Sequence, residues 1–249
     1  MKITKIWIFA FMIFASPFLL MSGCKKKNDD NSTNNNQIET GTMTDIEGNV
    51  YKTVKIGTQW WMAENLKTTK YNDGTSIPLV TEYLDWRYSR DPGYCWFEND
   101  SALYKDTYGA LYNWYVISTG KLAPTGWHIP SEVEWWTLIN YLGGWQIAGG
   151  KMKCTGTIEA GTGPWYEPNT GATNESGFSA VPTGAREEGG SFMHNPSYKA
   201  AYEADWWAAT EEDFNSALEC YISYKYAGAG CEPDGLDKCC GLSVRCVRD

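Results

Sequence analysis

The chain opens with a segment that decides which residues remain to fold and in which compartment. Lys2 and Lys5 precede an uninterrupted apolar run over residues 6–21, which is the charge order of an export signal. The run is shorter than the roughly 18 to 20 apolar residues that a membrane-spanning helix needs, and it leads into Ser22-Gly23-Cys24. We therefore expect residues 1–23 to be a signal peptide that is absent from the mature fold.

The last five residues of this segment, Leu20-Met21-Ser22-Gly23-Cys24, resemble the lipobox of bacterial lipoproteins, with Leu20 one place further from the cysteine than is usual. The resemblance implies that Cys24 becomes the first residue and carries diacylglycerol and palmitate. We then expect a lipid-anchored protein of the outer membrane, on either its periplasmic or its outer face. The alternative is an ordinary secretory signal, which would release a soluble protein.

Residues 24–40 are rich in Lys, Asp, Asn, Ser and Thr, with Ile38 the only large apolar side chain. Such a segment cannot bury enough apolar surface to offset the entropy cost of ordering it. We interpret it as a flexible tether that precedes one domain over residues 41–249. The whole chain carries a net charge of −9, which makes nucleic acid an improbable partner.

Seven cysteines remain after Cys24, and export to an oxidising compartment makes disulfides the expected state. An odd number leaves at least one thiol unpaired. Adjacent Cys239 and Cys240 cannot readily bridge each other, so we expect each to pair with a different cysteine. The chain has only two histidines and no C-x-x-C pair, so we expect no metal site of the zinc type.

Local patterns predict short strands around one or two helices. Residues 50–56 alternate at period two and are followed by 59–62 after Gly57-Thr58, which indicates a β-hairpin. Ser131 and Glu134 form a capping box before apolar residues at helical spacing, and Gly143-Gly144 supplies a stop. The remaining predictions are a turn at 71–74, a buried segment at 108–116, a long loop at 149–177, and strands at 177–181, 205–210, 218–224 and 242–247. The fold class is α+β.

Five phrases carry a family resemblance: residues 59–66 (QWWMAENL), 108–114 (YGALYNW), 124–131 (PTGWHIPS), 174–180 (NESGFSA) and 243–247 (SVRCV). Together they resemble the Fibrobacter succinogenes major paralogous domain over roughly residues 43–249. That family brings no established activity with it. Residues 127–135 and 244–246 are also similar to pieces of the formylglycine-generating-enzyme family, whose fold is akin to C-type lectins. This implies a C-type-lectin-like arrangement with long loops and closely placed termini, but no particular chemistry.

The 13 Trp and 16 Tyr supply either core or ligand contacts, because aromatic faces stack on sugar rings and also bury large areas. We assign Trp61, Trp114, Trp127 and Trp135, which lie in patterned segments, to the core. Trp86, Trp145 and Trp165 lie among Gly, Pro and charged residues, and we take them as candidate exposed contacts.

Glu167-Pro168-Asn169 is the tripeptide with which calcium-dependent C-type lectins bind calcium and sugar together, so Glu167 and Asn169 are also candidate ligand-binding residues. Their oxygens suit Ca²⁺, but a turn explains the tripeptide more simply and we predict no resident cofactor. His128 fits a structural role better than that of a general base. Glu187-Glu188 and Glu211-Glu212-Asp213 fit solvated surface charge better than paired catalytic carboxylates.

These observations favour a non-enzymatic binding or adhesion domain on the cell envelope, with polysaccharide or a surface protein as its partner. The alternatives are an exported enzyme that acts on protein or glycan and a structural component of the envelope. A deep polar cleft around His128 or an exposed thiol of low pKa would favour the enzyme.

Overall fold

The computed structural model describes residues 38–193 and 202–249. The predicted signal peptide, Cys24, most of the predicted tether and His194 lie outside the described residues. The first strand begins at Thr40, the last residue assigned to the tether. In the part of the chain that is described, no helix combines the length and the apolar character needed to cross a bilayer.

Short elements make up the domain. Within the described residues the strands are β1 Thr40–Thr44, β2 Val50–Ile56, β3 Gln59–Met62, β4 Tyr94–Trp96, β5 Ala110–Asn113, β6 Trp127–His128, β7 Glu203–Glu211, β8 Ser216–Ser223, β9 Gly230–Asp237, β10 Gly241–Leu242 and β11 Val247–Arg248. The helices are α1 Tyr83–Tyr88, η1 Phe97–Asn99, α2 Ser101–Tyr108, α3 Trp114–Ile117, α4 Glu132–Tyr141 and α5 Ala148–Met152.

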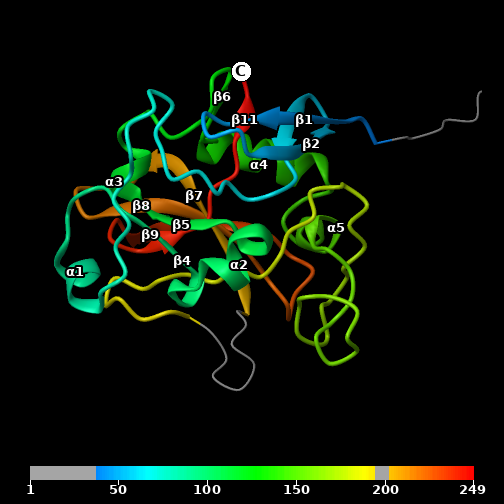
Figure 1. Cartoon of the computed structure of the whole chain (residues 1–249). Helices are drawn as coiled ribbons and strands as arrows, with labels where there is room; N and C mark the ends of the chain where they lie inside the picture. Colours follow the sequence, from blue (N-terminus) through cyan, green and yellow to red (C-terminus); the bar gives the residue numbers. More distant parts are fainter. Residues whose placement is uncertain (1–37, 194–201) are drawn as a thin grey trace, which may run out of the picture. The chain divides into compact units, whose positions relative to one another are not determined.

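The strands form three sheets in the orders β1-β2-β3-β11-β6, β10-β5-β4 and β7-β8-β9. Every pairing between these strands is antiparallel, which confirms the α+β class. The last strand, β11, lies between β3 and β6, so both ends of the described domain belong to one sheet (Figure 1). Sheet β7-β8-β9 and α4 pack on each other through the central aromatic core.

The predicted hairpin and the predicted helix are both confirmed. β2 pairs with β3 in a register that sets Val54 opposite Trp61. Ser131 caps α4 by accepting from the Glu134 amide at 3.4 Å, and the Glu134 carboxylate accepts from the Ser131 amide at 2.8 Å. Residues 71–74 form the expected turn, closed by the Gly74 amide on the Tyr71 carbonyl at 2.9 Å.

Within the described residues the structure has more helices and more strands than the sequence predicted, and one predicted strand did not form. α1, α2, α3 and α5 have between four and eight residues, too few for hydrophobic periodicity to mark them. Residues 177–181, predicted as a strand, contribute only the isolated bridge of Ala180 with Lys153. The predicted loop 149–177 begins inside α5 and is irregular beyond it.

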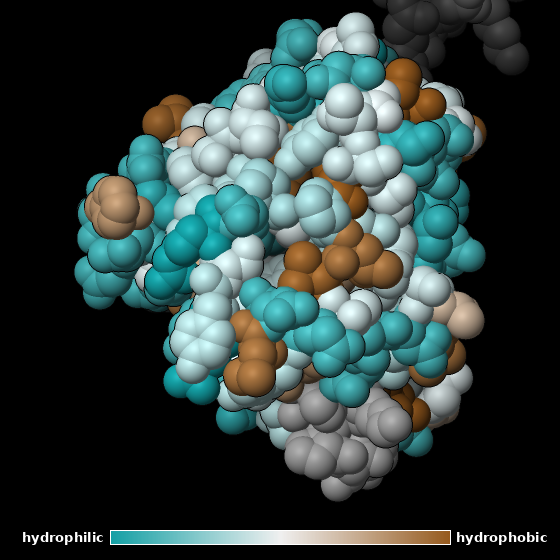
Figure 2. Space-filling view, turned by 60° about the vertical axis from the view of Figure 1, so that its left-hand side comes forward, coloured by the Kyte–Doolittle hydropathy of each residue, from teal (hydrophilic) through white to brown (hydrophobic). Residues whose placement is uncertain are grey.

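Four aromatic side chains fill the centre of the domain. Trp61, Trp135, Phe178 and Trp206 pack with ring centroids between 4.8 and 6.0 Å apart. Of the four tryptophans assigned to the core, Trp61, Trp114 and Trp135 are buried, and Trp127 is half-buried against the same interior. One face of the molecule is correspondingly hydrophilic over most of its area, with hydrophobic side chains in small patches (Figure 2).

Trp86 and Trp165 were predicted to be exposed, and this is wrong. Trp86 lies on the inner side of α1, where the Arg186 guanidinium stands 4.5 Å from its ring centroid. Gly241 makes room for it, because a Cβ there would approach the indole to 2.7 Å. Trp165 has no exposed surface, and its indole N–H donates to the Ala180 carbonyl at 3.0 Å. The charged and small neighbours that suggested exposure point outward while the indoles point in.

Within the described residues, one disulfide joins Cys220 to Cys231, which face each other across β8 and β9. Cys95, Cys154, Cys239, Cys240 and Cys246 are free thiols. The expectation that Cys239 and Cys240 each form a disulfide is therefore wrong. Their side chains instead lie near polar groups: the Cys239 thiol contacts the Ser89 carbonyl at 3.4 Å, and the Cys240 thiol contacts the Glu188 carboxylate at 3.9 Å.

Candidate functional site

An aromatic groove with a volume of about 290 Å³ lies where α4, the loop before α5, and the β8–β9 hairpin meet. We call it the aromatic groove. Its walls are the side chains of Trp136, Trp145, Tyr221 and Tyr226, and its floor is formed by small residues around Gly228–Gly230 and by Cys231. This size is at the lower end of the range of about 300 to 1,000 Å³ for small-molecule pockets.

Helix α4 places Trp136 on the groove because consecutive helical residues point about 100° apart. Trp135 points into the core, so Trp136 emerges at the side of the helix, where its indole N–H donates to the Glu132 carboxylate at 3.0 Å. This bond fixes the orientation of the ring. The position of Trp136 next to a core tryptophan, together with the helical period, could have predicted from the sequence that Trp136 is half-exposed.

Backbone contacts dock the β8–β9 loop against the segment that carries Trp145. The Ala229 amide donates to the Trp145 carbonyl at 2.9 Å, and the Gly150 amide donates to the Ala227 carbonyl at 2.7 Å. A Cβ at Gly149 would lie 1.9 Å from the Gly228 carbonyl oxygen, so only glycine permits this approach. The groove is therefore set by main-chain packing between segments about eighty residues apart in sequence.

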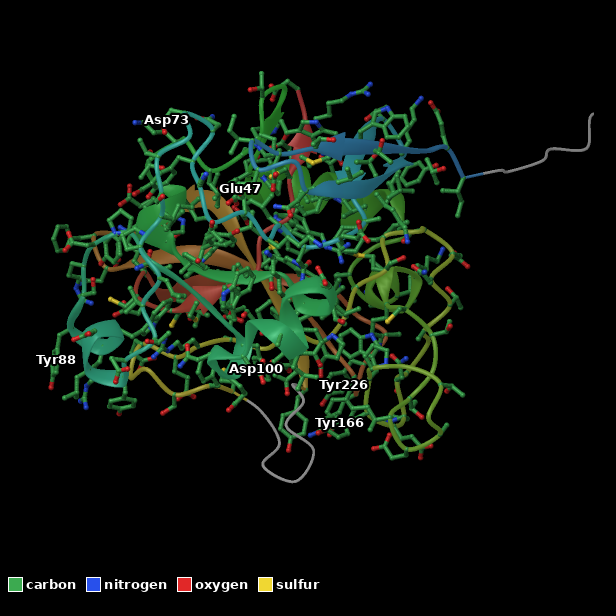
Figure 3. The ribbon with its side chains drawn as sticks, in the orientation of Figure 1. Glu47, Asp73, Tyr88, Asp100, Tyr166 and Tyr226 are labelled. Carbon is green, nitrogen blue, oxygen red and sulfur yellow. A yellow bond between two sulfur atoms is a disulfide. The ribbon has the colours of Figure 1, made fainter. Side chains whose placement is uncertain are left out.

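Two of the four walls are open to solvent. Trp145 is 60% exposed and Tyr226 is 67% exposed, whereas most other tryptophans of the domain are buried. Tyr226 lies beside the loops that follow α5, and Tyr88 lies well apart from it, at the left of the view on α1 (Figure 3). Large aromatic side chains that a fold leaves exposed around a concave surface are typical of ligand contacts.

Polar groups complete the groove. Burial and the nearby Glu232 carboxylate raise the pKa of Tyr221 above its ordinary value, so its hydroxyl keeps its proton and can donate. Tyr226 and Ser223 supply two further hydroxyls. The combination of flat aromatic faces with hydroxyl and carboxylate groups at their edges matches a ligand that has apolar C–H faces and polar rims.

Of the residues predicted as ligand contacts, the structure brings only Trp145 to this groove. Trp86 and Trp165 are core residues. Glu167 is exposed, but Asn169 is 6% exposed and turns inward, with its amide nitrogen donating to the carbonyls of Cys154 and Gly156 at 3.1 and 3.0 Å. The Asn169 side chain thus holds the loop, and the pair does not converge on one ligand. Within residues 38–193 and 202–249, no three His, Cys, Asp or Glu side chains are arranged to hold a metal ion.

His128 has both ring nitrogens occupied, as its structural interpretation requires. Nδ1 pairs with the Asp249 carboxylate at 2.6 Å, and Nε2 pairs with the Glu134 carboxylate at 2.7 Å. Burial lowers the pKa of His128, but these two hydrogen bonds raise it more, so the net shift is upward. The pairing ties β6, the start of α4 and the chain end together.

Contacts within the protein engage the second acidic run, and burial keeps the free thiols protonated. Glu211 pairs with Lys238, and the Asp213 carboxylate accepts from the Ser216 amide at 2.7 Å. Burial raises the pKa of Cys95 to about 12 and that of Cys239 to about 11. Burial also raises the pKa of the other free thiols, Cys154, Cys240 and Cys246. All five therefore remain protonated at neutral pH, whereas a reactive cysteine needs the thiolate.

The order of the segments that build the domain matches a known family model. The model of the Fibrobacter succinogenes major domain matches residues 54–248, which is most of the chain. The chain belongs to this family. No curated protein and no solved structure shows a significant match to it.

Several of the phrases typical of the Fibrobacter succinogenes major domain meet at one buried side chain. Arg245, 1% exposed, donates from Nε to the Asn65 amide oxygen at 2.7 Å and from Nη2 to the Ser179 carbonyl at 3.1 Å. Its Nη1 donates to the carbonyls of Met62 and Phe178. We call this set the Arg245 hub. The family phrases therefore specify the interior of the domain, whereas the aromatic groove draws mainly on residues outside them.

Proposed function

We propose that this protein is a lipid-anchored component of the cell envelope whose domain binds polysaccharide without chemical change, through the aromatic groove. The observation that carries the proposal is the gathering of Trp136, Trp145, Tyr221 and Tyr226 from three separate segments around one concave surface. A sugar ring presents C–H groups on its faces and hydroxyls on its rim. The groove offers aromatic faces and hydroxyl groups in the same arrangement.

The C-type-lectin-like arrangement inferred from the sequence supports this proposal. Such domains keep their termini together, and here β1 and β11 belong to the same sheet. They also carry long irregular segments, as residues 153–181 do. The groove does not use the Glu167-Pro168-Asn169 tripeptide, so we propose recognition by stacking and hydroxyl contacts without calcium.

The anchor part of the proposal rests on the lipobox resemblance at Cys24. Mass spectrometry of protein recovered from the envelope should find a lipid-modified Cys24 as the first residue, and Cys24→Ala should move the protein to the soluble fraction. Recovery of the intact signal peptide on cytosolic protein would contradict this part and would leave the groove untouched.

The binding part is tested with full-length protein in detergent on a glycan array and on insoluble polysaccharides. Trp145→Ala and Tyr226→Ala should each weaken binding by about 30-fold, because removal of an aromatic anchor at an interface costs about 2 kcal/mol. Tyr88→Ala is the matched control: Tyr88 is 71% exposed, but it lies on α1, away from the groove. Binding that is absent, or that all three variants retain, would rule out the groove as a sugar site.

A further inference from the structure

A second pocket lies beside the aromatic groove, at the start of β7, where Asp205 and Glu203 pair with Tyr221 and Ser223 of the groove. Its volume is about 340 Å³, and its lining includes Tyr202, Glu203, Asp205, Tyr224 and Lys225. We call it the acidic pocket. It shares no lining residue with the aromatic groove, so the inference below does not depend on the proposed function.

Asp205 is the unusual residue of this pocket. It is 6% exposed, and within the described residues its carboxylate has neither a hydrogen bond nor an ion pair. A buried carboxylate normally has such partners, because burial without compensation costs several kcal/mol. The side chain of Asp205 therefore lines a pocket with its hydrogen-bonding capacity unused.

More negative charge lies on the same face of the sheet. Glu219 is 9% exposed and is a diagonal neighbour of Asp205 across β7 and β8, since Asp205 pairs with Tyr221 and Trp207 pairs with Glu219. Glu232 is opposite Glu219 on β9. Burial raises the pKa of Asp205 well above its ordinary value, and Glu219 adds to the effect. A cation in the pocket would relieve this repulsion.

The aromatic walls select the kind of cation. The rings of Tyr202 and Tyr224 lie 5.7 Å apart between centroids at an interplanar angle of 33°, and an ammonium group is attracted to such faces within about 6 Å. Lys225 already shows this contact, because its Nζ stands 5.6 Å from the centroid of Tyr224. Lys225 is exposed and makes no ion pair with Asp205 within the described residues, so an incoming amine can displace it.

We propose that the acidic pocket binds a protonated aliphatic amine, with its ammonium group on the Asp205 carboxylate and its methylene chain lying along the outer surface of the packed Tyr202 and Tyr224 rings. A divalent metal ion fits less well, since the described residues offer no set of three acidic, histidine or cysteine ligands. The amine is either a free diamine or the side chain of a lysine in a protein, and the experiment below separates these two sources.

The test is isothermal titration of the full-length protein in detergent with 1,5-diaminopentane in one arm and N-acetyl-lysine-methylamide in the other. We expect saturable binding in at least one arm, and the stronger arm identifies the source. Asp205→Asn should weaken this binding by at least about tenfold, the size of one charge-assisted hydrogen bond. The folded state should survive the change, because the variant removes an unpaired buried charge.

A second variant should shift binding in the opposite direction. Lys225→Met removes the positive charge that competes for the pocket, and we expect it to bind the amine more tightly. Glu212→Gln, on the exposed turn between β7 and β8, is the control and should have no effect. Saturable heat from neither amine, tight binding that Asp205→Asn leaves unchanged, or saturable binding of Ca²⁺ in place of the amines would each overturn the proposal. Loss of sugar binding by the aromatic-groove variants would not bear on it.

Discussion

Two buried ionisable side chains of this domain, Arg245 and Asp205, have opposite surroundings. Arg245 donates hydrogen bonds to four different residues and lies 4.1 Å from the centroid of the Phe178 ring. The Asp205 carboxylate has no hydrogen-bond partner within the described residues and lines a pocket. Hydrogen bonds offset the free-energy cost of burying the Arg245 guanidinium, whereas no such bonds offset the cost of burying the Asp205 carboxylate. We infer that Arg245 serves the fold and that Asp205 serves binding.

The Arg245 hub follows from the family phrases, and the two proposed binding sites do not. Asn65, Ser179 and Arg245 belong to three of these phrases and meet in the Arg245 hub. Asp205 and Trp145 lie outside all of them. Members of a family can share an interior while their exposed pockets differ, which explains why family membership carries a fold here and leaves the ligand to be found by experiment.

The largest expected effect is at Arg245. Arg245→Met should lower the free energy of unfolding by at least about 3 kcal/mol, because the carbonyls of Phe178 and Ser179 lose the guanidinium that donates to them. Urea denaturation measures this. Arg248→Met is the control: Arg248 is exposed, and its guanidinium lies over the Trp60 ring, so we expect a change below about 1 kcal/mol. If the two variants proved equally stable, the hub would have no special structural role.

Glu219 should make the free energy of unfolding depend on pH, and the sign of this dependence follows from its pKa. Burial, with Glu203 and Glu232 nearby, raises its pKa from 4.5 to about 8 in the folded protein. The folded state therefore binds more protons than the unfolded chain between these values, and stability that is present below about pH 4.5 is lost as the pH rises toward about 8. Glu219→Gln should remove this loss, with a gain of roughly 1 to 3 kcal/mol at the alkaline end.

Urea midpoints of the wild type and Glu219→Gln, measured at several values between about pH 5 and 8, test this sign. Some slope should remain in the variant, because the pKa of His128 is also raised by Asp249 and Glu134 and its contribution is lost over the same range. Glu212→Gln should keep the wild-type slope. A slope that is the same in all three proteins would show that Glu219 is not buried as described.

Sequence alone predicted the local elements that have their own chemical signals. The capping box of Ser131 and Glu134 located α4, and strict alternation located β2. The four short helices lacked enough turns for such a pattern, although Asp100 does cap α2 by accepting from the Leu103 amide at 3.0 Å. Patterns in one segment also cannot show which glycine admits a neighbouring indole, and that is why Trp86 was placed outside.

The proposed binding sites were harder to predict because their residues come together through contacts between distant segments. Trp145 and Tyr226 become neighbours through main-chain contacts such as the bond of the Ala229 amide to the Trp145 carbonyl. Asp205 alternates with core residues along β7, a pattern that indicates a solvent-facing side chain. Asp205 is nevertheless 6% exposed, and Gly184 and Met193 from another segment line the pocket beside it. When a second segment buries an acidic residue, the sequence of the strand that carries the residue does not predict that burial.

The smallest expected change in stability, after those at Arg245 and Glu219, is at Ser131. It measures how much a hydrogen-bonded polar group close to solvent contributes to folding. Ser131 is half-buried and shares the Glu134 carboxylate, which its hydroxyl contacts at 2.8 Å. Ser131→Ala should lower the free energy of unfolding by about 0.5 to 2 kcal/mol through loss of the cap, and thermal unfolding will detect the change. Ser131→Asp, which can still accept from the Glu134 amide but brings a second carboxylate beside it, should recover part of this loss. If Ser131→Ala destabilised the domain as much as Arg245→Met, a cap near the surface would contribute as much to stability as a buried guanidinium. Burial would then not explain why the Arg245 hub matters more than ordinary polar contacts.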